Sequence, residues 1–283
     1  MSKSVVITKA SGEQVPFSAE KLRKSLHRAG AGKDVIEIIV SEIEKILYPG
    51  ISTREIYRDA FSLLKKQSRP LAAKYKLKKA IQQLGPSGYP FEKYVGEIFK
   101  HEGYAVQVGQ IVQGHCVQHE VDVIAQKDDL HFMIECKFHS DDGRKCDVKI
   151  PLYIHSRFLD VGRAWKEISG HAQKFHQGWV VTNTRFTGDA IQYGTCVGLQ
   201  LTSWDFPKKN SLRERIDRAG LHPITCLTTL TKNEKQQLLD KGIVLCKELC
   251  HQDHLLNEIS LVPKRVRKVQ EEAKLLCQSK IEF

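Results

Sequence analysis

The segment HEVDVIAQKDDLHFMIECKFH, residues 119–139, contains two strand-like apolar runs that each carry charge in their interior. The first run holds Asp122, and the second holds Glu135 and Lys137. Burying a charge in a strand is unfavourable unless the charge is paired or binds a metal ion. These three side chains are therefore the first candidates for a functional site.

Strand geometry tells how the three charges could meet. Side chains alternate along a strand, so Glu135 and Lys137 point to one face and Cys136 to the other. If the strand of Asp122 pairs alongside, the carboxylates of Asp122 and Glu135 lie close together and repel each other when both are ionised. A divalent cation removes that repulsion, and hard oxygen ligands favour Mg²⁺ or Mn²⁺, with the carbonyl oxygen of Cys136 as a third candidate ligand.

A lysine beside such an ion has a chemical use. Lys137 could orient a water molecule or stabilise charge on a phosphate oxygen, and these are parts of phosphodiester hydrolysis. A simpler alternative is a structural ion pair in which Lys137 bridges Asp122 and Glu135 at a sheet edge. The spacing alone leaves both interpretations open, because an acid followed thirteen positions later by Glu-x-Lys is a short pattern.

The sequence around this segment predicts an α/β fold with a mixed sheet flanked by helices. The expected strands cover residues 104–112, 121–125, 130–138, 179–183 and 198–204. The expected helices cover residues 91–103, 157–175 and 187–197.

The segment GPSGYP, residues 85–90, is a strong break before this fold. Ahead of it, the sequence predicts a small α+β module with strands at 5–9 and 13–17 and helices at 19–30, 33–48, 51–66 and 70–84. After Pro207 the pattern is mostly helical. We therefore expect three domains, at residues 1–84, 85–206 and 207–283.

Charge and composition narrow the class of protein. The net charge is +11, and residues 1–88 hold 17 Lys and Arg against 8 Asp and Glu, whereas the rest holds 27 against 25. A basic protein suggests a polyanionic partner. The sequence shows no signal peptide and no run of about 18 apolar residues, and its eight cysteines are scattered, so we expect a cytoplasmic protein with reduced thiols and no membrane partner.

The central segments, FEKYVGEIFKHEGY, HEVDVIA and FMIECKFH, resemble the PD-(D/E)XK nucleases, and within them the Mrr-like restriction endonucleases. The resemblance covers about residues 86–206. It implies that Asp122 and Glu135 bind the metal ion, that Lys137 is the catalytic lysine and that Glu92 is the acid of the first helix. Glu97, five positions later on that helix, is a competitor for the role of Glu92.

The N-terminal segment VVITKASGEQVPFSAEKLRKSLHRAG resembles the ATP cone, a nucleotide-sensing module made of a β-hairpin and a helical bundle. The resemblance covers residues 1–84 and implies that ATP or dATP binds as a regulator. The matching positions are Ile7 and Lys9 in the hairpin, Lys21 in the first helix and Thr53 at the third. A cone that keeps only a structural role is the alternative.

Together these resemblances imply a Mg²⁺-dependent endodeoxyribonuclease of the restriction type that acts on double-stranded DNA and is controlled by an adenine nucleotide. Cutting both strands usually takes two active sites, so a homodimer is expected. Two alternatives stay open: a DNA-binding regulator that does not cleave, and a nuclease similar to Holliday-junction resolvases. The DNA recognition site, the cut pattern and the choice between ATP and dATP cannot be read from the sequence.

Overall fold

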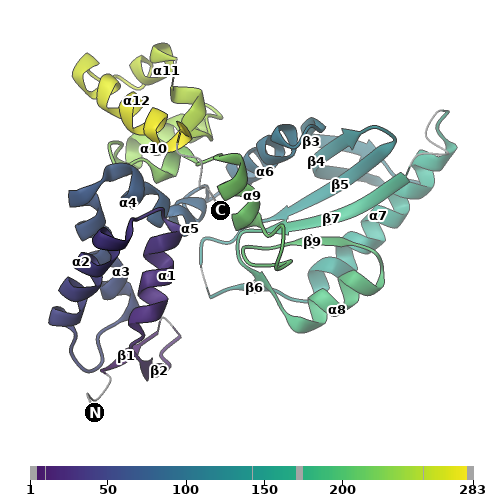
Figure 1. The fold of residues 1–283 in the computed structure, drawn as a ribbon. Coiled ribbons are helices and arrows are strands. Elements are labelled where there is room, and N and C mark those ends of the chain that lie inside the picture. Colours follow the sequence, from purple (N-terminus) through teal and green to yellow (C-terminus); the bar gives the residue numbers. More distant parts are fainter. Residues whose placement is uncertain (1–4, 10, 142, 170–174, 251, 279–283) are drawn as a thin grey trace. The chain divides into compact units, whose positions relative to one another are not determined.

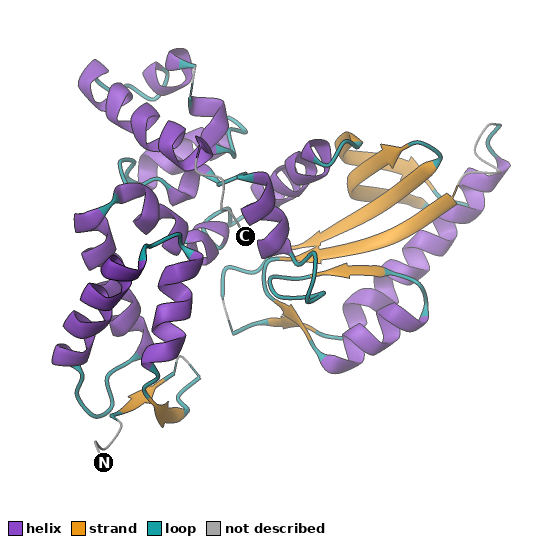
Figure 2. Ribbon diagram, in the orientation of Figure 1, coloured by secondary structure: helices purple, strands orange, loops and turns teal. Residues whose placement is uncertain are grey.

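The computed structural model describes residues 5–9, 11–141, 143–169, 175–250 and 252–278 (Figures 1 and 2). The chain packs as two compact units, and both are discontinuous in sequence. The first unit contains Met1–Ala80, His222–Gln237 and Cys246–Phe283, and the second contains Ile81–Leu221 and Leu238–Leu245. The domain boundaries expected after residues 84 and 206 stay predictions.

The first unit begins with the expected hairpin, β1 (Val6–Thr8) and β2 (Gln14–Pro16), which pair antiparallel. A bundle of helices follows: α1 (Ala19–Arg28), α2 (Lys33–Ile46), α3 (Thr53–Gln67), α4 (Arg69–Tyr75) and α5 (Leu77–Ile81). Local capping explains where two of them start. Ser18 accepts the N–H of Lys21 at 3.3 Å, and Ser52 forms a reciprocal capping box with Glu55.

Apolar residues on one face of each helix build the core of this bundle. Leu26, Ile39, Ile43 and Leu64 are fully buried and belong to one cluster that joins α1, α2 and α3. The helix expected over residues 70–84 is divided into α4 and α5 at Lys76, although the N–H of Lys76 still bonds to the carbonyl of Ala72 at 3.0 Å.

The C-terminal residues of the first unit are helical, as the sequence predicts. They form η1 (Ile224–Cys226), the first part of α10 (Lys232–Asp240), η2 (Cys246–Leu249), α11 (Asp253–Asn257) and α12 (Pro263–Gln278). The expected cap of α10 is present, since Thr231 and Glu234 exchange hydrogen bonds at 2.8 and 3.3 Å. Helix α12 packs on η2 and on α4.

The second unit is built on a five-stranded mixed sheet in the order β3-β4-β5-β7-β9, drawn as orange arrows in Figure 2. Its strands are β3 (Ala105–Gln113), β4 (Gln118–Lys127), β5 (Leu130–Lys137), β7 (Phe175–Thr182) and β9 (Gln200–Thr202). The first three pair antiparallel, and β5, β7 and β9 pair parallel. The mixed α/β fold is confirmed.

Helices cover both faces of this sheet. Helix α6 (Tyr89–His101) packs on β3 and β4, and Gly96 lets it approach closely, because a Cβ there would lie 3.1 Å from the side chain of Val108. Helix α7 (Lys149–Glu167) and helix α8 (Gly188–Cys196) share a core with the other face through Met133, Ile154 and Leu201. The unit is completed by α9 (Leu212–Ala219) and by the short pair β6 (Lys145–Cys146) and β8 (Arg185–Phe186).

One expected helix is wrong at its start. The sequence predicts a helix over residues 157–175, whereas α7 begins at Lys149 and ends at Glu167. No side chain caps its N-terminus, so the usual start signal is missing from the sequence. Residues 170–174 of the expected helix lie outside the described residues. The earlier start places Arg157 in the middle of the helix that covers the sheet.

No helix in the described part of the chain is long and apolar enough to span a bilayer.

Arg215 should contribute to the stability of the second unit through an ion pair and two cation–π contacts. It is 5% exposed, donates its Nε to Glu102 at 2.8 Å and stacks over the rings of Phe99 and Trp179 at 4.4 and 5.1 Å. Arg215→Ala should lower the free energy of unfolding by about 2 kcal/mol, because Glu102 loses its partner and two cation–π contacts disappear. Arg218→Ala, an exposed change on the same helix, should cost under about 0.5 kcal/mol in the same urea denaturation experiment. Equal losses in both variants would contradict this assignment.

Candidate active site

Asp122, Glu135 and Lys137 lie close together at the place where strands β4 and β5 separate. Backbone pairing between these strands ends at the Val123–Ile134 pair. Beyond this pair, the carboxylate of Asp122 replaces the hydrogen-bond acceptor that a paired backbone would provide. Its Oδ2 accepts the N–H of Cys136 at 2.6 Å. Asp122 and Glu135 are therefore neighbours at the end of the ladder.

Glu135 is the most enclosed charge of the site. The residue is only 5% exposed, and both of its carboxylate oxygens are held by cations. Lys137 donates to Oε1 at 2.5 Å, and Arg157 of α7 donates to Oε2 at 2.6 Å. Arg157 also donates to the backbone carbonyl of Glu120 on β4. The ammonium of Lys137 remains within reach of solvent, with 29% of its side chain exposed.

Two acids at this site, Asp122 and Glu92, have raised pKa values. Burial raises the pKa of Asp122 to about 6, with a further contribution from Glu135, while the Cys136 N–H and Lys137 oppose the shift. Burial also raises the pKa of Glu92 to about 7, followed by the charges of Asp122, Glu120 and Glu135. Because negative charge at one acid disfavours ionisation of the next, the site favours a cation.

Of the two candidate acids on helix α6, Glu92 rather than Glu97 interacts with the charges of Asp122 and Glu135. Glu92 lies in the first turn of the helix and is half-buried, and the charges of Asp122 and Glu135 act on its pKa. Glu97 forms an ion pair with Lys100 at 2.7 Å on the same helix. The geometry thus favours Glu92 as the acid that α6 contributes.

The donor set has the chemistry of a hard divalent cation. Asp122 and Glu135 provide carboxylate oxygens, and the sulfur of Cys136 is an unsuitable ligand because burial raises the pKa of its thiol far above the usual value. No group of three His, Cys, Asp or Glu side chains able to hold a metal ion occurs among the described residues. The two carboxylates therefore fit Mg²⁺ only together with backbone or solvent oxygens, such as the carbonyl oxygen of Cys136.

Three further polar residues after Glu-x-Lys have structural partners. His155 bonds to the hydroxyl of Tyr193 at 2.9 Å, and the backbone N–H of His139 donates to the side chain of Asn183 at 2.8 Å. Asp160 accepts from the N–H of Cys116 and from the ring of His119, and this last bond holds its pKa well below the usual range. These contacts give the three residues roles in holding loops and helices together.

In the first unit, the residues that resemble nucleotide contacts lie at the end of the bundle where the hairpin meets α1 and α3. Ile7 is buried in β1, and Lys9 forms an ion pair with Glu13 at 2.9 Å. Thr53 begins α3, next to the bridge between β1 and Ser52, and the exposed Lys21 lies in the first turn of α1. The N-termini of two helices therefore converge on this end, where their dipoles favour an anion.

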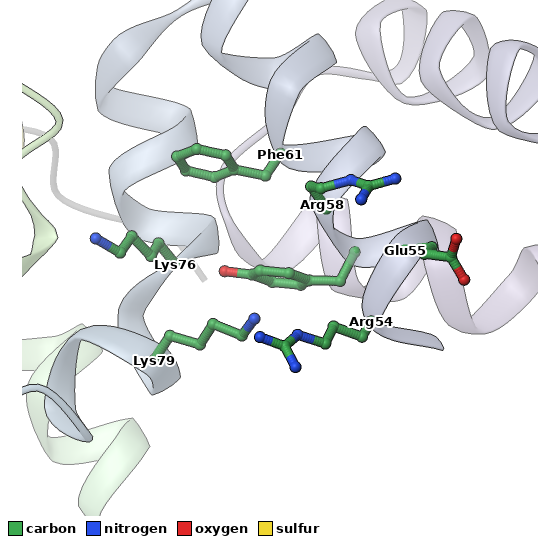
Figure 3. A pocket seen from close by; sticks show the side chains of 7 residues that line it. Arg54, Glu55, Arg58, Phe61, Lys76 and Lys79 are labelled. Carbon is green, nitrogen blue, oxygen red and sulfur yellow. The ribbon is translucent and has the colours of Figure 1, made fainter. Parts of the chain in front are cut away.

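A pocket of about 470 Å³ opens along α3 and extends to α5, and Figure 3 shows its lining side chains. Four cations and two aromatic rings line it, with Glu55 as the one acid: Arg54, Glu55, Tyr57, Arg58, Phe61, Lys76 and Lys79. Glu55 is engaged with Ser52, so its charge is partly satisfied by the helix cap. The pocket therefore has the charge of an anion-binding site.

A second ammonium group lies close to Lys76. The side chains of Lys76 and Lys235 both donate to the carbonyl of Thr225, at 3.2 and 3.1 Å. Burial, and then the charge of Lys76, lower the pKa of Lys235 to about 8. Two adjacent cations on one neutral carbonyl add to the positive potential near the pocket.

Sequence reasoning missed the partners of these sites. It did not predict the contact of Arg157 with Glu135. It also missed Arg54 and Arg58, although two arginines four positions apart directly after Thr53 are a readable signal of one basic helix face.

Comparison with known proteins gives three family matches. Residues 5–83 match the ATP cone domain, residues 85–150 match the Mrr catalytic restriction endonuclease domain, and residues 222–277 match the AF1548-like C-terminal domain. An uncharacterised protein of Archaeoglobus fulgidus is 35% identical over 181 residues, which are 64% of this chain and 98% of that relative. The crystal structure of AF1548, a protein of unknown function, has 35% identity and a TM-score of 0.56, covering 67% of this chain and 97% of the other.

The fold, the site and these matches define an ATP cone followed by an Mrr-like restriction endonuclease domain and an AF1548-like C-terminal domain. Since nearly the whole of the Archaeoglobus fulgidus protein is matched at 35% identity, the chain belongs to the same family as that protein.

The raised pKa of Glu92 predicts how metal-free stability depends on pH. Because the folded chain holds this proton up to a pKa of about 7, whereas a free glutamate releases it near 4.5, Glu92 favours folding at low pH and that benefit is lost as the pH rises through this window. Glu92→Gln should therefore stabilise the protein at pH 8 by about 1 kcal/mol, a value reduced for solvent screening of the half-exposed side chain, and have little effect near pH 4.5.

Thermal denaturation in EDTA at both pH values would measure this difference. Glu97→Gln is the matched control on the same helix and should show no gain at pH 8, because Glu97 already has Lys100 as a partner. A gain for Glu97→Gln, or none for Glu92→Gln, would contradict the electrostatic account.

Proposed function

We propose that this protein is a Mg²⁺-dependent DNA endonuclease of the restriction type whose activity is regulated by ATP or dATP. The observation that carries the proposal is the convergence of Asp122, Glu135 and Lys137 at the point where β4 and β5 part. The restriction endonuclease match over residues 85–150 supports the reaction class.

Each side chain has a role that follows from its position. Asp122 and Glu135, with the carbonyl oxygen of Cys136, would hold the cation, which when bound polarises the phosphate and lowers the pKa of a water ligand. Lys137, partly exposed beside Glu135, orients the attacking water and stabilises charge on the phosphate. Glu92, with a pKa of about 7, is suited to accept a proton from that water near neutral pH.

In the reaction, the water oxygen forms a bond to phosphorus, one P–O ester bond breaks, and the departing oxygen of the DNA strand takes up a proton. The partner is double-stranded DNA. The excess of basic residues in the N-terminal third of the sequence supports a polyanionic partner for the protein. A homodimer would bring the second active site that a double-strand cut requires.

Plasmid cleavage tests the nuclease assignment. Wild-type protein with Mg²⁺ should cut supercoiled plasmid, and Asp122→Asn and Lys137→Ala should each lower the cleavage rate by a factor of about 100 or more, because each removes charge stabilisation at the reacting phosphate. Lys166→Ala, an exposed change on α7, is the control and should cut like wild type. Equal rates in all four proteins would reject the proposed site.

Two other results would favour a different function for this protein. Tight DNA binding without cleavage in Mg²⁺ or Mn²⁺ would indicate a nucleotide-responsive regulator that does not cut. Faster cleavage of four-way junctions than of linear duplex would indicate a resolvase-like nuclease.

The regulatory part of the proposal places an adenine nucleotide on the cone. Ile7, Lys9, Lys21 and Thr53 would contact it at the hairpin end, and the pocket that begins one residue beyond Thr53 would hold phosphates with Arg54 and the other cations that line it. Arginine side chains suit phosphate because their planar fork donates two hydrogen bonds.

Nucleotide titration by calorimetry tests this placement. Lys9→Ala and Arg54→Ala should each weaken ATP binding by roughly tenfold, the effect of losing one charged hydrogen bond. Lys65→Ala, an exposed change near the far end of α3, is the control and should bind ATP like wild type. Loss in Lys9→Ala alone would exclude the α3 pocket, and absence of binding in wild type would indicate a cone with a structural role only.

A further inference from the structure

Among the contacts of the described residues, only that of Arg157 connects α7 to both β4 and β5 at the candidate site. One nitrogen of its guanidinium donates to Oε2 of Glu135 on β5 at 2.6 Å, and the other donates to the backbone carbonyl of Glu120 on β4. Its side chain is only 10% exposed, and its charged carbon lies 5.4 Å from the ring centre of Tyr153 one turn earlier on α7. The guanidinium is thus fixed from three directions.

The charge of Arg157 matters because Glu135 lies in an acidic, enclosed place. Glu135 and Asp122 are both largely buried, and Glu92 adds a third carboxyl group nearby. Buried carboxylates need compensating positive charge. That charge comes from Lys137 on Oε1 and from Arg157 on Oε2, so each oxygen that a metal ion would use already accepts a hydrogen bond from a cation.

We infer that Arg157 is a positioning residue that competes with the divalent cation for Glu135. This inference rests on the metal site of the proposed function. The guanidinium occupies Oε2 when no metal is bound, and metal binding requires that this ion pair be released or shared. Arg157 therefore compensates the charge of Glu135 in the folded protein and at the same time weakens the affinity of the site for metal.

The bond to the carbonyl of Glu120 keeps the guanidinium of Arg157 next to Glu135. A carbonyl is neutral, so this bond does not depend on the charge of Glu135 and holds the arginine beside the site after its other bond is lost. A lysine at this position would keep a positive charge but would lack the planar fork that reaches both acceptors. A lysine would therefore still compensate the charge of Glu135 but would lose the bond to Glu120.

Mn²⁺ binding to the full-length protein, followed by calorimetry without DNA, tests this inference. Arg157→Met removes the charge and keeps an apolar stem, and it should bind Mn²⁺ at least tenfold more tightly than wild type. Arg157→Lys retains the charge and should stay within about threefold of wild type. Arg163→Met, an exposed change of the same kind six positions further along α7, is the matched control and should bind like wild type.

Thermal denaturation provides a second readout that a purely structural role would not produce. In EDTA, Arg157→Met should melt below wild type, because Glu135 loses one of its two cations. Saturating Mn²⁺ should then raise its melting temperature by more than it raises that of wild type, since the stabilisation grows as the dissociation constant falls. Unchanged or weaker Mn²⁺ binding in Arg157→Met would overturn the inference.

Arginine side-chain NMR on the wild-type chain covers the case in which Arg157→Met does not fold. The Nη1–H signal of Arg157, assigned by its absence from the spectrum of Arg157→Lys, should shift on titration with Mg²⁺ as the bond from Nη1 to Glu135 is released or shared. A signal that stays in place at saturating Mg²⁺ would overturn the inference.

Asp122→Asn separates this inference from the proposed metal site. If wild type and Arg157→Met both bind Mn²⁺ through Asp122 with equal affinity, the metal site stands and the role of Arg157 is rejected. If neither protein shows saturable binding that depends on Asp122, the metal site itself is rejected, and the inference fails with it.

Discussion

The second unit depends on one constraint, the need to keep the buried carboxylate of Glu135 charged and compensated inside a sheet. Two cations satisfy it, one from the same strand and one from the helix that covers that face. The strands part at this place, and the carboxylate of Asp122 completes the hydrogen bonding that the backbone no longer supplies. The candidate site and the local structure therefore rest on the same few bonds.

Electrostatics also explains why the two units differ in character. In the second unit acids gather at a strand end, and the pKa values of Asp122 and Glu92 rise because these side chains are enclosed and lie near other negative charges. In the first unit cations gather along α3 and α5, and the pKa of the nearby Lys235 falls for the same physical reasons. One unit has the charge of a cation site and the other that of an anion site, which suits a metal ion in one and a nucleotide in the other.

Much of this architecture could be predicted from the sequence, because the signals are local. The cap at Ser18, the apolar strand over residues 130–137 and the stop at Gly103 each depend on a few neighbouring residues, and all three are present in the structure. The pairing of Asp122 with the end of β5 was also predictable, since two strands joined by a short turn pair in a register set by that turn.

What the sequence could not provide depends on packing between distant segments. Arg157 and Glu135 are 22 positions apart, and their contact requires the path of α7 across the sheet, whose start has no cap to reveal it. The two-residue strands β6 and β8 are too short to give a pattern. The pocket on α3 needs Lys76, between α4 and α5, and Lys79 of α5, so the spacing of residues within α3 alone could not show it.

The discontinuous path of the chain affects its response to proteolysis and the exchange of its domains between proteins. The polypeptide passes between the two units at four places, after residues 80, 221, 237 and 245. A break at any one of these places would leave the other three covalent connections intact, so a single proteolytic cut could not release a unit. A fragment that stops at residue 84 would also lack α12, and the surface of α4 that α12 covers would be left bare in water. Shuffling of the cone alone between proteins therefore requires a replacement cover for that surface.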